Sequence, residues 1–234
     1  MMRTTLGGRI AVGFAVIATG LGSPAASAGQ DTSADPRLLE SIEWYLGVTG
    51  TVDDARAREL LESVAENRDD ILARMWIARV HSTGRMTFPE DKPLARRIAA
   101  EVIDEIRGLA AEGDVEAIFL MGTAYDEGLG VDIDHVEALR WYSEAAEHDH
   151  VLAVHNIGNM YRDGRGVEPD MEQATRFWLR AARAGDVIPA LRLAEAYEAG
   201  NGVPRDLDAA RTWYRRAADA GNANARAALA RLGG

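Results

Sequence analysis

The sequence contains no cysteine, so a disulfide framework, a thiolate metal site and a cysteine nucleophile are all excluded. Basic residues are in deficit as well. The 26 lysine and arginine residues face 37 aspartate and glutamate residues, which gives a formal net charge of -11. A surface of that sign repels nucleic-acid phosphates and anionic lipid headgroups. We therefore expect no nucleic-acid partner, and a fold whose stability comes from packing alone.

Long apolar runs are also scarce. The longest, Ile10 to Leu21, has about twelve residues, too few to cross roughly 30 Å of hydrocarbon as a helix. Two arginines precede it, and Ala26 and Ala28 follow in the small-x-small pattern of a signal-peptidase site. We predict a signal peptide over residues 1–28, cleaved after Ala28, and hence export to the bacterial periplasm without stable membrane insertion. Secretion, or retention by an uncleaved N-terminal anchor, is the alternative.

Residues recur at a spacing of 36 in the second half of the chain, and ten columns stay in register over three units. The clearest columns hold Tyr125, Tyr161 and Tyr197; Gly128, Gly164 and Gly200; Gly130, Gly166 and Gly202; Asp134, Asp170 and Asp206; and Ala138, Ala174 and Ala210. A fixed period of this length indicates stacked supersecondary units. We predict three regular 36-residue repeats over residues 113–221.

Each unit is predicted to be two helices joined by a turn. In the first unit, the helix expected over residues 116–127 gathers its apolar side chains on one face. Gly128 and Gly130 supply the positive φ of a turn, and Asp134 then caps the second helix. Glu137 lies three residues after Asp134, which predicts a capping box. Because neither helix can bury its apolar face alone, the pairs are expected to stack.

The pattern continues upstream in divergent form over residues 36–112, which are predicted to hold two further helix pairs. His81 and Gly84 precede their counterparts by 44 residues instead of 36, and the eight added residues are assigned to one longer helix. One unit earlier, Tyr45 precedes His81 by 36. The remaining predicted segments are a short linker at 29–35, helices at 36–47, 52–67 and 91–112, and a capping helix within 222–234.

Two stretches carry a family motif. The first is Leu120 to Tyr125, followed by Gly128 to Val131, Asp134, Ala138, Trp141, Tyr142, Ala145 and Ala146; the second is Asn156 to Tyr161 with Gly164 to Val167. The motif resembles the Sel-one-like repeat, a relative of the tetratricopeptide repeat, most specifically over residues 110–220. The resemblance implies an all-α fold, a right-handed α-solenoid of stacked antiparallel helix pairs that serves as an adaptor. Some exported relatives with a disulfide in each repeat are associated with β-lactam binding, which is not carried over to a chain without cysteine.

The resemblance also implies that a protein or peptide partner lies in the concave groove lined by the first helices. The register assigns nine groove-facing positions, spaced i, i+4 and i+7 in each unit: Phe119, Thr123, Asp126, His155, Asn159, Arg162, Leu191, Glu195 and Glu198. Aromatic, aliphatic, acidic and basic side chains are mixed, as a peptide groove requires. An ordinary solvated helix face would show the same mixture, so both interpretations stay open.

Catalytic motifs are scarce. The sequence has no nucleophile elbow, phosphate loop or metalloprotease signature, and its Gly-x-Gly pairs follow predicted helices, not strands. Aromatic pairs such as Trp141 and Tyr142 are expected to fill the space between neighbouring units. We predict no enzyme, no catalytic residue, no cofactor and no bound metal. The alternative is a hydrolase acting on cell wall or small molecules through carboxylates such as Asp126, Glu127 and Asp163; a purely structural role is the third hypothesis.

Histidines form one local concentration, since His135, His148, His150 and His155 lie within 21 residues. Imidazoles beside carboxylates suit a weak zinc or copper site, and histidine is the usual sensor of acid. The main expectation is a solvated turn. Taken together, these features predict an exported binding scaffold that regulates an envelope receptor or the assembly of a surface complex.

Overall fold

The computed structural model describes residues 33–48 and 50–233, which form eleven α-helices and no β-strand. The predicted signal peptide and its cleavage site lie outside these residues. Within them, no helix is both long and apolar enough to cross a membrane. The helices are α1 Pro36–Leu46, α2 Asp54–Ala65, α3 Ile71–Thr83, α4 Lys92–Ala111, α5 Val115–Glu127, α6 His135–Glu147, α7 Val151–Asp163, α8 Met171–Arg183, α9 Ala190–Ala199, α10 Leu207–Asp219 and α11 Ala223–Arg231.

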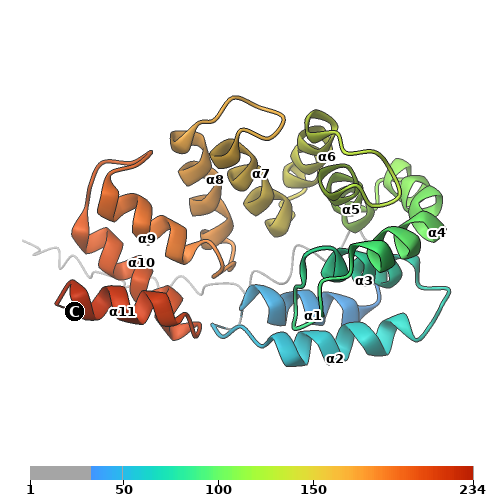
Figure 1. The fold of residues 1–234 in the computed structure, drawn as a ribbon, viewed down its shortest axis with the longest axis horizontal. Helices are drawn as coiled ribbons and strands as arrows, with labels where there is room; N and C mark the ends of the chain where they lie inside the picture. Colours follow the sequence, from blue (N-terminus) through green and yellow to red (C-terminus); the bar gives the residue numbers. More distant parts are fainter. Residues whose placement is uncertain (1–32, 49, 234) are drawn as a thin grey trace, which may run out of the picture.

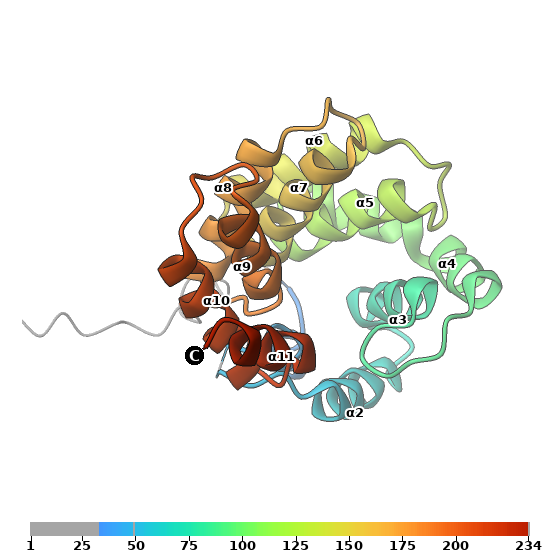
Figure 2. The same ribbon diagram turned by 60° about the vertical axis from the view of Figure 1, so that its left-hand side comes forward.

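Consecutive helices pack as antiparallel pairs, from α1 with α2 to α9 with α10, and α11 packs on α10 at the end. The five pairs stack into a right-handed α-solenoid that curves back on itself, as Figures 1 and 2 show. This confirms the predicted fold class. The longest helix is α4, with 20 residues, where the upstream unit has its added residues.

An aspartate side chain caps each of the five second helices, as the spacing predicts for the three regular units. Asp134 accepts hydrogen bonds from the backbone N–H groups of Val136 and Glu137, and both distances are 3.0 Å. The capping box, however, was a wrong prediction. The backbone N–H of Asp134 donates to the carbonyl of Tyr125 at 3.0 Å, and the Glu137 carboxylate instead binds Arg140. The tyrosine column thus anchors the cap of the second helix through its backbone.

The two glycines of each turn have different roles. Gly128 has φ 70° and ends α5 in the left-handed region, which glycine adopts without steric cost. The second glycine permits contact between units: a Cβ on Gly166 would lie 2.2 Å from the carbonyl oxygen of His135, at the start of the preceding unit's second helix. The Gly-x-Gly pairs are therefore structural, as their position after helices predicted.

Small residues allow the helices of one pair to approach closely. A Cβ on Gly122 would lie 2.5 Å from the Tyr142 ring, and one on Gly158 would lie 2.6 Å from the Trp178 ring. These rings are fully buried against their own unit's first helix. The expectation that aromatic pairs fill the space between units thus needs correction, because Tyr142 and Trp178 pack inside their pairs.

Two local registers differ from the sequence pattern. In the first pair, Trp44 and not Tyr45 occupies the column of His81, because α1 ends at Gly47 and the carbonyl of Trp44 accepts the N–H of Asp53. In the last regular unit, α9 begins at Ala190, so its first turn is lost. Pro189 explains this loss, since proline disfavours helical backbone in the residue before it.

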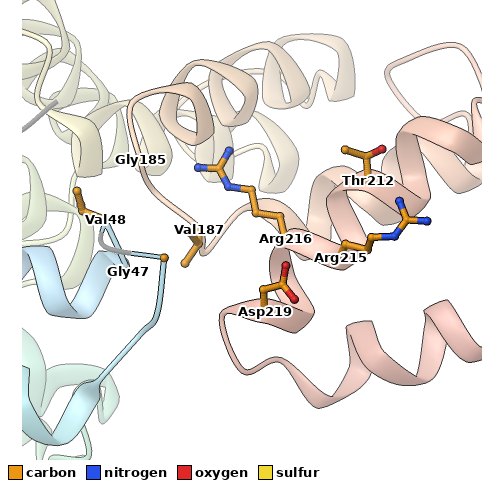
Figure 3. A pocket seen from close by; sticks show the side chains of 9 residues that line it. Gly47, Val48, Gly185, Val187, Thr212, Arg215, Arg216 and Asp219 are labelled. Atoms are coloured by element: carbon orange, nitrogen blue, oxygen red, sulfur yellow. The ribbon is translucent and has the colours of Figure 1, made fainter. Parts of the chain in front are cut away.

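The unwound segment before α9 closes the arc. The N–H of Val187 donates to the carbonyl of Leu46 at 3.1 Å, and a Cβ on Gly47 would lie 2.6 Å from the Val187 side chain. A hollow of about 380 Å³ lies beside this contact. Figure 3 shows its lining side chains, among them Arg216 of α10, which extends toward Gly185. The two ends of the solenoid therefore meet at a seam formed by the α1–α2 turn, the segment before α9, and α10.

Candidate functional site

The concave side of the solenoid is lined by the first helices of successive pairs. Figure 2 shows α3, α5 and α7 on the inner side of the arc, with α4, α6 and α8 outside them. The inner helices touch one another directly, α3 against α5 and α5 against α7. Equivalent positions of successive units therefore form continuous rows on this side.

Of the nine positions predicted to face the groove, three are buried and six reach the surface. Phe119 and Thr123 are 0% exposed and His155 is 5% exposed. Of the others, Glu195 is exposed, and the rest are half-buried: Asp126, Asn159, Arg162, Leu191 and Glu198. An accessible row thus runs along α7 and α9, whereas the side chain of Asp126, the last predicted member on α5, is only 7% exposed.

Phe119 is buried because neighbouring units pack over it, and Thr123 is buried against Tyr142 of its own unit. The Phe119 ring lies 5.9 Å from Trp76 of α3 and is stacked at 4.4 Å on the ring of His150, which precedes α7. Thr123 accepts a hydrogen bond from the Tyr142 hydroxyl at 3.2 Å. Phe119 thus links its unit to both neighbours, whereas Thr123 binds within its own unit. The expectation that these two side chains face a partner is corrected.

A charged cluster lies where α3 meets α5. Arg85 binds the Glu127 carboxylate at 2.8 Å, and the Ser82 hydroxyl donates to the same carboxylate. Burial opposes ionisation of Glu127, but Arg85 and, more weakly, Arg79 and Ser82 outweigh burial and hold its pKa below the usual range. Glu127 therefore stays ionised as the counter-charge of this cluster.

The other two carboxylates of the hydrolase alternative are also engaged by arginine. Asp126 pairs with Arg165 and lies 3.1 Å from Nδ1 of His135. Asp163 binds Arg162 through two contacts of 2.5 and 2.7 Å, and this hydrogen bonding lowers the pKa of Asp163. Carboxylates that are held in ion pairs with arginine are better suited to balancing positive charge than to transferring protons at neutral pH. The arrangement gives the hydrolase alternative no support.

A hollow of about 260 Å³ opens between α7, α8 and α9. The guanidinium carbons of Arg162 and Arg192 lie 5.9 and 5.8 Å from the ring centroid of Trp178. Burial lowers the pKa of Arg192, and the neighbouring Arg162 lowers it further. Nε2 of His155 is a distant partner of Arg192, at 3.5 Å. The hollow thus places a cation with spare hydrogen-bond donors on the accessible row.

Sequence reasoning missed two arginines of the concave side. Arg192 follows Leu191 directly and so falls outside the row that the register selected. Arg79 precedes Thr123 by 44 residues, so extending the row upstream with the spacing of the divergent unit would have found it. That spacing is the available signal, although it does not predict that Arg79 is buried.

His150 and His155 link different helices and do not lie in a solvated turn, whereas His148 is exposed. His150 caps α7 through Nδ1 and places Nε2 3.1 Å from Glu116, whose other oxygen accepts the Trp76 indole N–H at 2.7 Å. Nδ1 of His155 lies 2.6 Å from the fully buried Asp186. The imidazoles of His150 and His155 therefore each have a carboxylate partner outside their own helix. Among the described residues, no three potential ligands converge on a metal-binding position.

A model of the Sel1 repeat family matches residues 115–150, 151–186 and 190–222. The chain contains three Sel1 repeats. The third match begins at residue 190, where α9 begins in the structure. Proteins of this repeat family are commonly scaffolds for protein–protein interaction and are generally not enzymes. No curated protein sequence matches the chain.

Solved structures of Sel1 repeat proteins share the fold. A protective antigen of uropathogenic Escherichia coli with an SLR fold is 26% identical, with a TM-score of 0.54 over 82% of this chain and 47% of the antigen. A Sel1 repeat protein from Oxalobacter formigenes is 28% identical, with a TM-score of 0.54 over 77% of this chain and 50% of that protein. The chain thus spans about half the length of these two relatives.

Proposed function

We propose that this Sel1 repeat protein is an exported scaffold that binds a segment of another protein along its concave side. The observation that carries the proposal is the Arg162–Arg192 hollow over Trp178, which lies on the row of accessible positions. Its volume of about 260 Å³ is below the range of roughly 300–1,000 Å³ that is typical of small-molecule sites. A hollow of this size suits side chains of a longer polypeptide.

The accessible row supplies the remaining contacts of the proposed groove. Asn159, Leu191, Glu195 and Glu198 extend it along α7 and α9 with one apolar and several polar side chains. Such a surface suits a partner segment of mixed charge, and fits the scaffold role that is common in this family. The signal peptide expected over residues 1–28 supports a partner in the bacterial periplasm or at the cell exterior, as a receptor or surface complex would be.

Charge reversal in the hollow tests the function. Full-length wild type, Arg192→Glu and Arg176→Glu are used as bait on envelope extracts of the encoding organism, with quantitative mass spectrometry of the retained proteins. Arg176 is exposed on α8, so its reversal makes the same change of net charge away from the hollow. The amount of a specific partner that the bait retains should fall at least tenfold with Arg192→Glu and stay unchanged with Arg176→Glu. Equal retention by all three baits would contradict binding at this hollow.

A further inference from the structure

Arg79 of α3 is a buried cation, and two of its three guanidinium nitrogens have no hydrogen-bonding partner among the described residues. The residue is 2% exposed, and its Nε and Nη1 atoms have no acceptor among the described residues. Burying an ionised side chain is costly unless a counter-charge or hydrogen bonds compensate for lost hydration. The fold therefore bears a cost at this position that packing alone does not explain.

Aromatic rings surround this guanidinium. Its central carbon lies 4.4 Å from the Trp76 ring, 5.3 Å from the Phe119 ring and 5.8 Å from the Tyr45 ring. Cation–π attraction offsets part of the desolvation, but a ring face does not replace the planar acceptors that a guanidinium binds in pairs. An uncharged, apolar side chain would fit the same aromatic surroundings without that cost.

The local charge balance is positive. Arg79 and Arg85 share a single carboxylate, Glu127, which already binds Arg85 at 2.8 Å and accepts the Ser82 hydroxyl. Burial lowers the pKa of Arg79, and the proximity of Arg85 lowers it further, while Glu127 opposes both effects only in part. One more carboxylate would balance the two guanidinium groups.

The position of Arg79 in the repeat also indicates binding. Its counterparts in the regular units are Thr123, Asn159 and Glu195, so this column differs in every unit. The packing columns, by contrast, repeat glycine, alanine or aromatic residues. Residues that break the period on the concave side are where a repeat scaffold distinguishes its partners.

We propose that Arg79 and Arg85 form a carboxylate-binding site at the α3–α5 crossing, which recognises an acidic group of the partner segment. The proposal rests on the scaffold function and adds the chemistry of its partner. Arg85, half-buried at the surface of the cluster, meets the carboxylate first, and Arg79 binds it from the interior through Nε and Nη1. The partner's carboxylate replaces Glu127 as the acceptor of the Arg85 hydrogen bonds. Glu127 and the partner therefore compete for Arg85.

Three probes of one skeleton test the site on the full-length chain by calorimetry and by the ¹⁵N resonance of the Arg79 Nε–H. N-acetyl-glutaminamide is neutral, N-acetyl-isoglutamine carries a side-chain carboxylate, and N-acetyl-glutamine carries a terminal carboxylate. At least one acid should bind at millimolar concentration and shift the Arg79 resonance, and the acid that binds more tightly identifies the source of the partner's carboxylate. Glu127→Gln should tighten that binding at least threefold, and Arg97→Gln, exposed on α4, should leave it unchanged.

Arg79→Met separates a binding role from a structural one. It should abolish acid binding while the melting temperature stays within about 2 °C of wild type or rises, because replacement of a buried uncompensated charge is often neutral or stabilising. Arg85→Gln should weaken binding at least fivefold without touching the aromatic cluster.

Three results would overturn the carboxylate site: no acid binds better than the neutral probe, Arg192→Gln and not Arg79→Met abolishes binding, or Arg79→Met melts more than about 5 °C lower. If capture of the partner from envelope extracts still depends on Arg192, the proposed scaffold function remains supported. The two proposals therefore fail independently.

Discussion

The same substitution in two adjacent helices should change stability in opposite directions. Gly108→Ala and Gly122→Ala both place alanine in a helix, a gain of about 1 kcal/mol in helix propensity. Nothing lies within 4 Å of a Cβ at Gly108. At Gly122 the new Cβ would lie 2.5 and 2.7 Å from Cδ1 and Cε1 of Tyr142, whereas carbon atoms in contact are about 3.5–4.0 Å apart.

Tyr142 cannot yield easily, since it is 0% exposed and its hydroxyl is bonded to Thr123. Overpacking of this kind costs about 1–3 kcal/mol. The propensity gain is common to both variants and cancels, so Gly122→Ala should be about 1–3 kcal/mol less stable than Gly108→Ala.

Urea unfolding followed by circular dichroism at 222 nm measures this difference in the free energy of unfolding. In thermal melts, the melting temperatures of the two variants should differ by about 2–4 °C for each kcal/mol. Gly108→Ala should itself exceed wild type by about 0.5–1 kcal/mol. Equal stability of the two variants would refute the close packing of Tyr142 on α5, and with it the explanation of the small-residue column.

Three further predictions concern the cap, the charged cluster and the seam. Asp134→Ala should lose about 1 kcal/mol in urea unfolding because two capping hydrogen bonds disappear, whereas Asp134→Asn should lose much less. Because the pKa of Glu127 is lowered in the folded state, its contribution to stability is complete above the unfolded carboxyl pKa and is lost as the pH falls through the folded pKa. The difference in melting temperature between wild type and Glu127→Gln should therefore narrow from pH 6 to pH 3. A difference that stays constant over this range would contradict the ion pair with Arg85. Gly47→Ala should enlarge the radius of gyration measured by small-angle scattering, because its new Cβ would lie 2.6 Å from the Val187 side chain. Gly50→Ala should leave the radius unchanged, because no atom lies within 4 Å of a Cβ at that position. Equal radii for the two variants would contradict a closed seam.

The parts of the fold that could be predicted from the sequence are those set by contacts between residues close together in the chain. The aspartate cap of α6 and the glycine that ends α5 depend on backbone groups a few residues away, so their spacing alone identifies them. Stacking follows from the period itself. The capping box failed because the backbone N–H of Asp134 was already bound by Tyr125, a partner in the preceding helix that the short motif does not include.

Long-range packing explains what the sequence could not predict. Phe119 occupies a groove position by register but is buried by Trp76 and His150, which come from other units. The hydrogen bond from Val187 to Leu46 joins the first helix pair to the segment before α9, which is distant in the sequence. Neither contact leaves a periodic signal, so the accessible part of the groove emerges only when the curvature of the solenoid is known.

Site-specific photo-crosslinking tests most directly whether the concave side binds a partner protein. A photoreactive residue replaces Glu195, exposed on α9 beside the Arg162–Arg192 hollow, or Glu172, exposed on α8, and the chain is irradiated in its native cell. A partner bound on the concave side should give a discrete protein adduct from position 195 and no adduct of that mass from position 172. The same adduct from both positions, or from neither, would contradict a binding scaffold that works through its concave side.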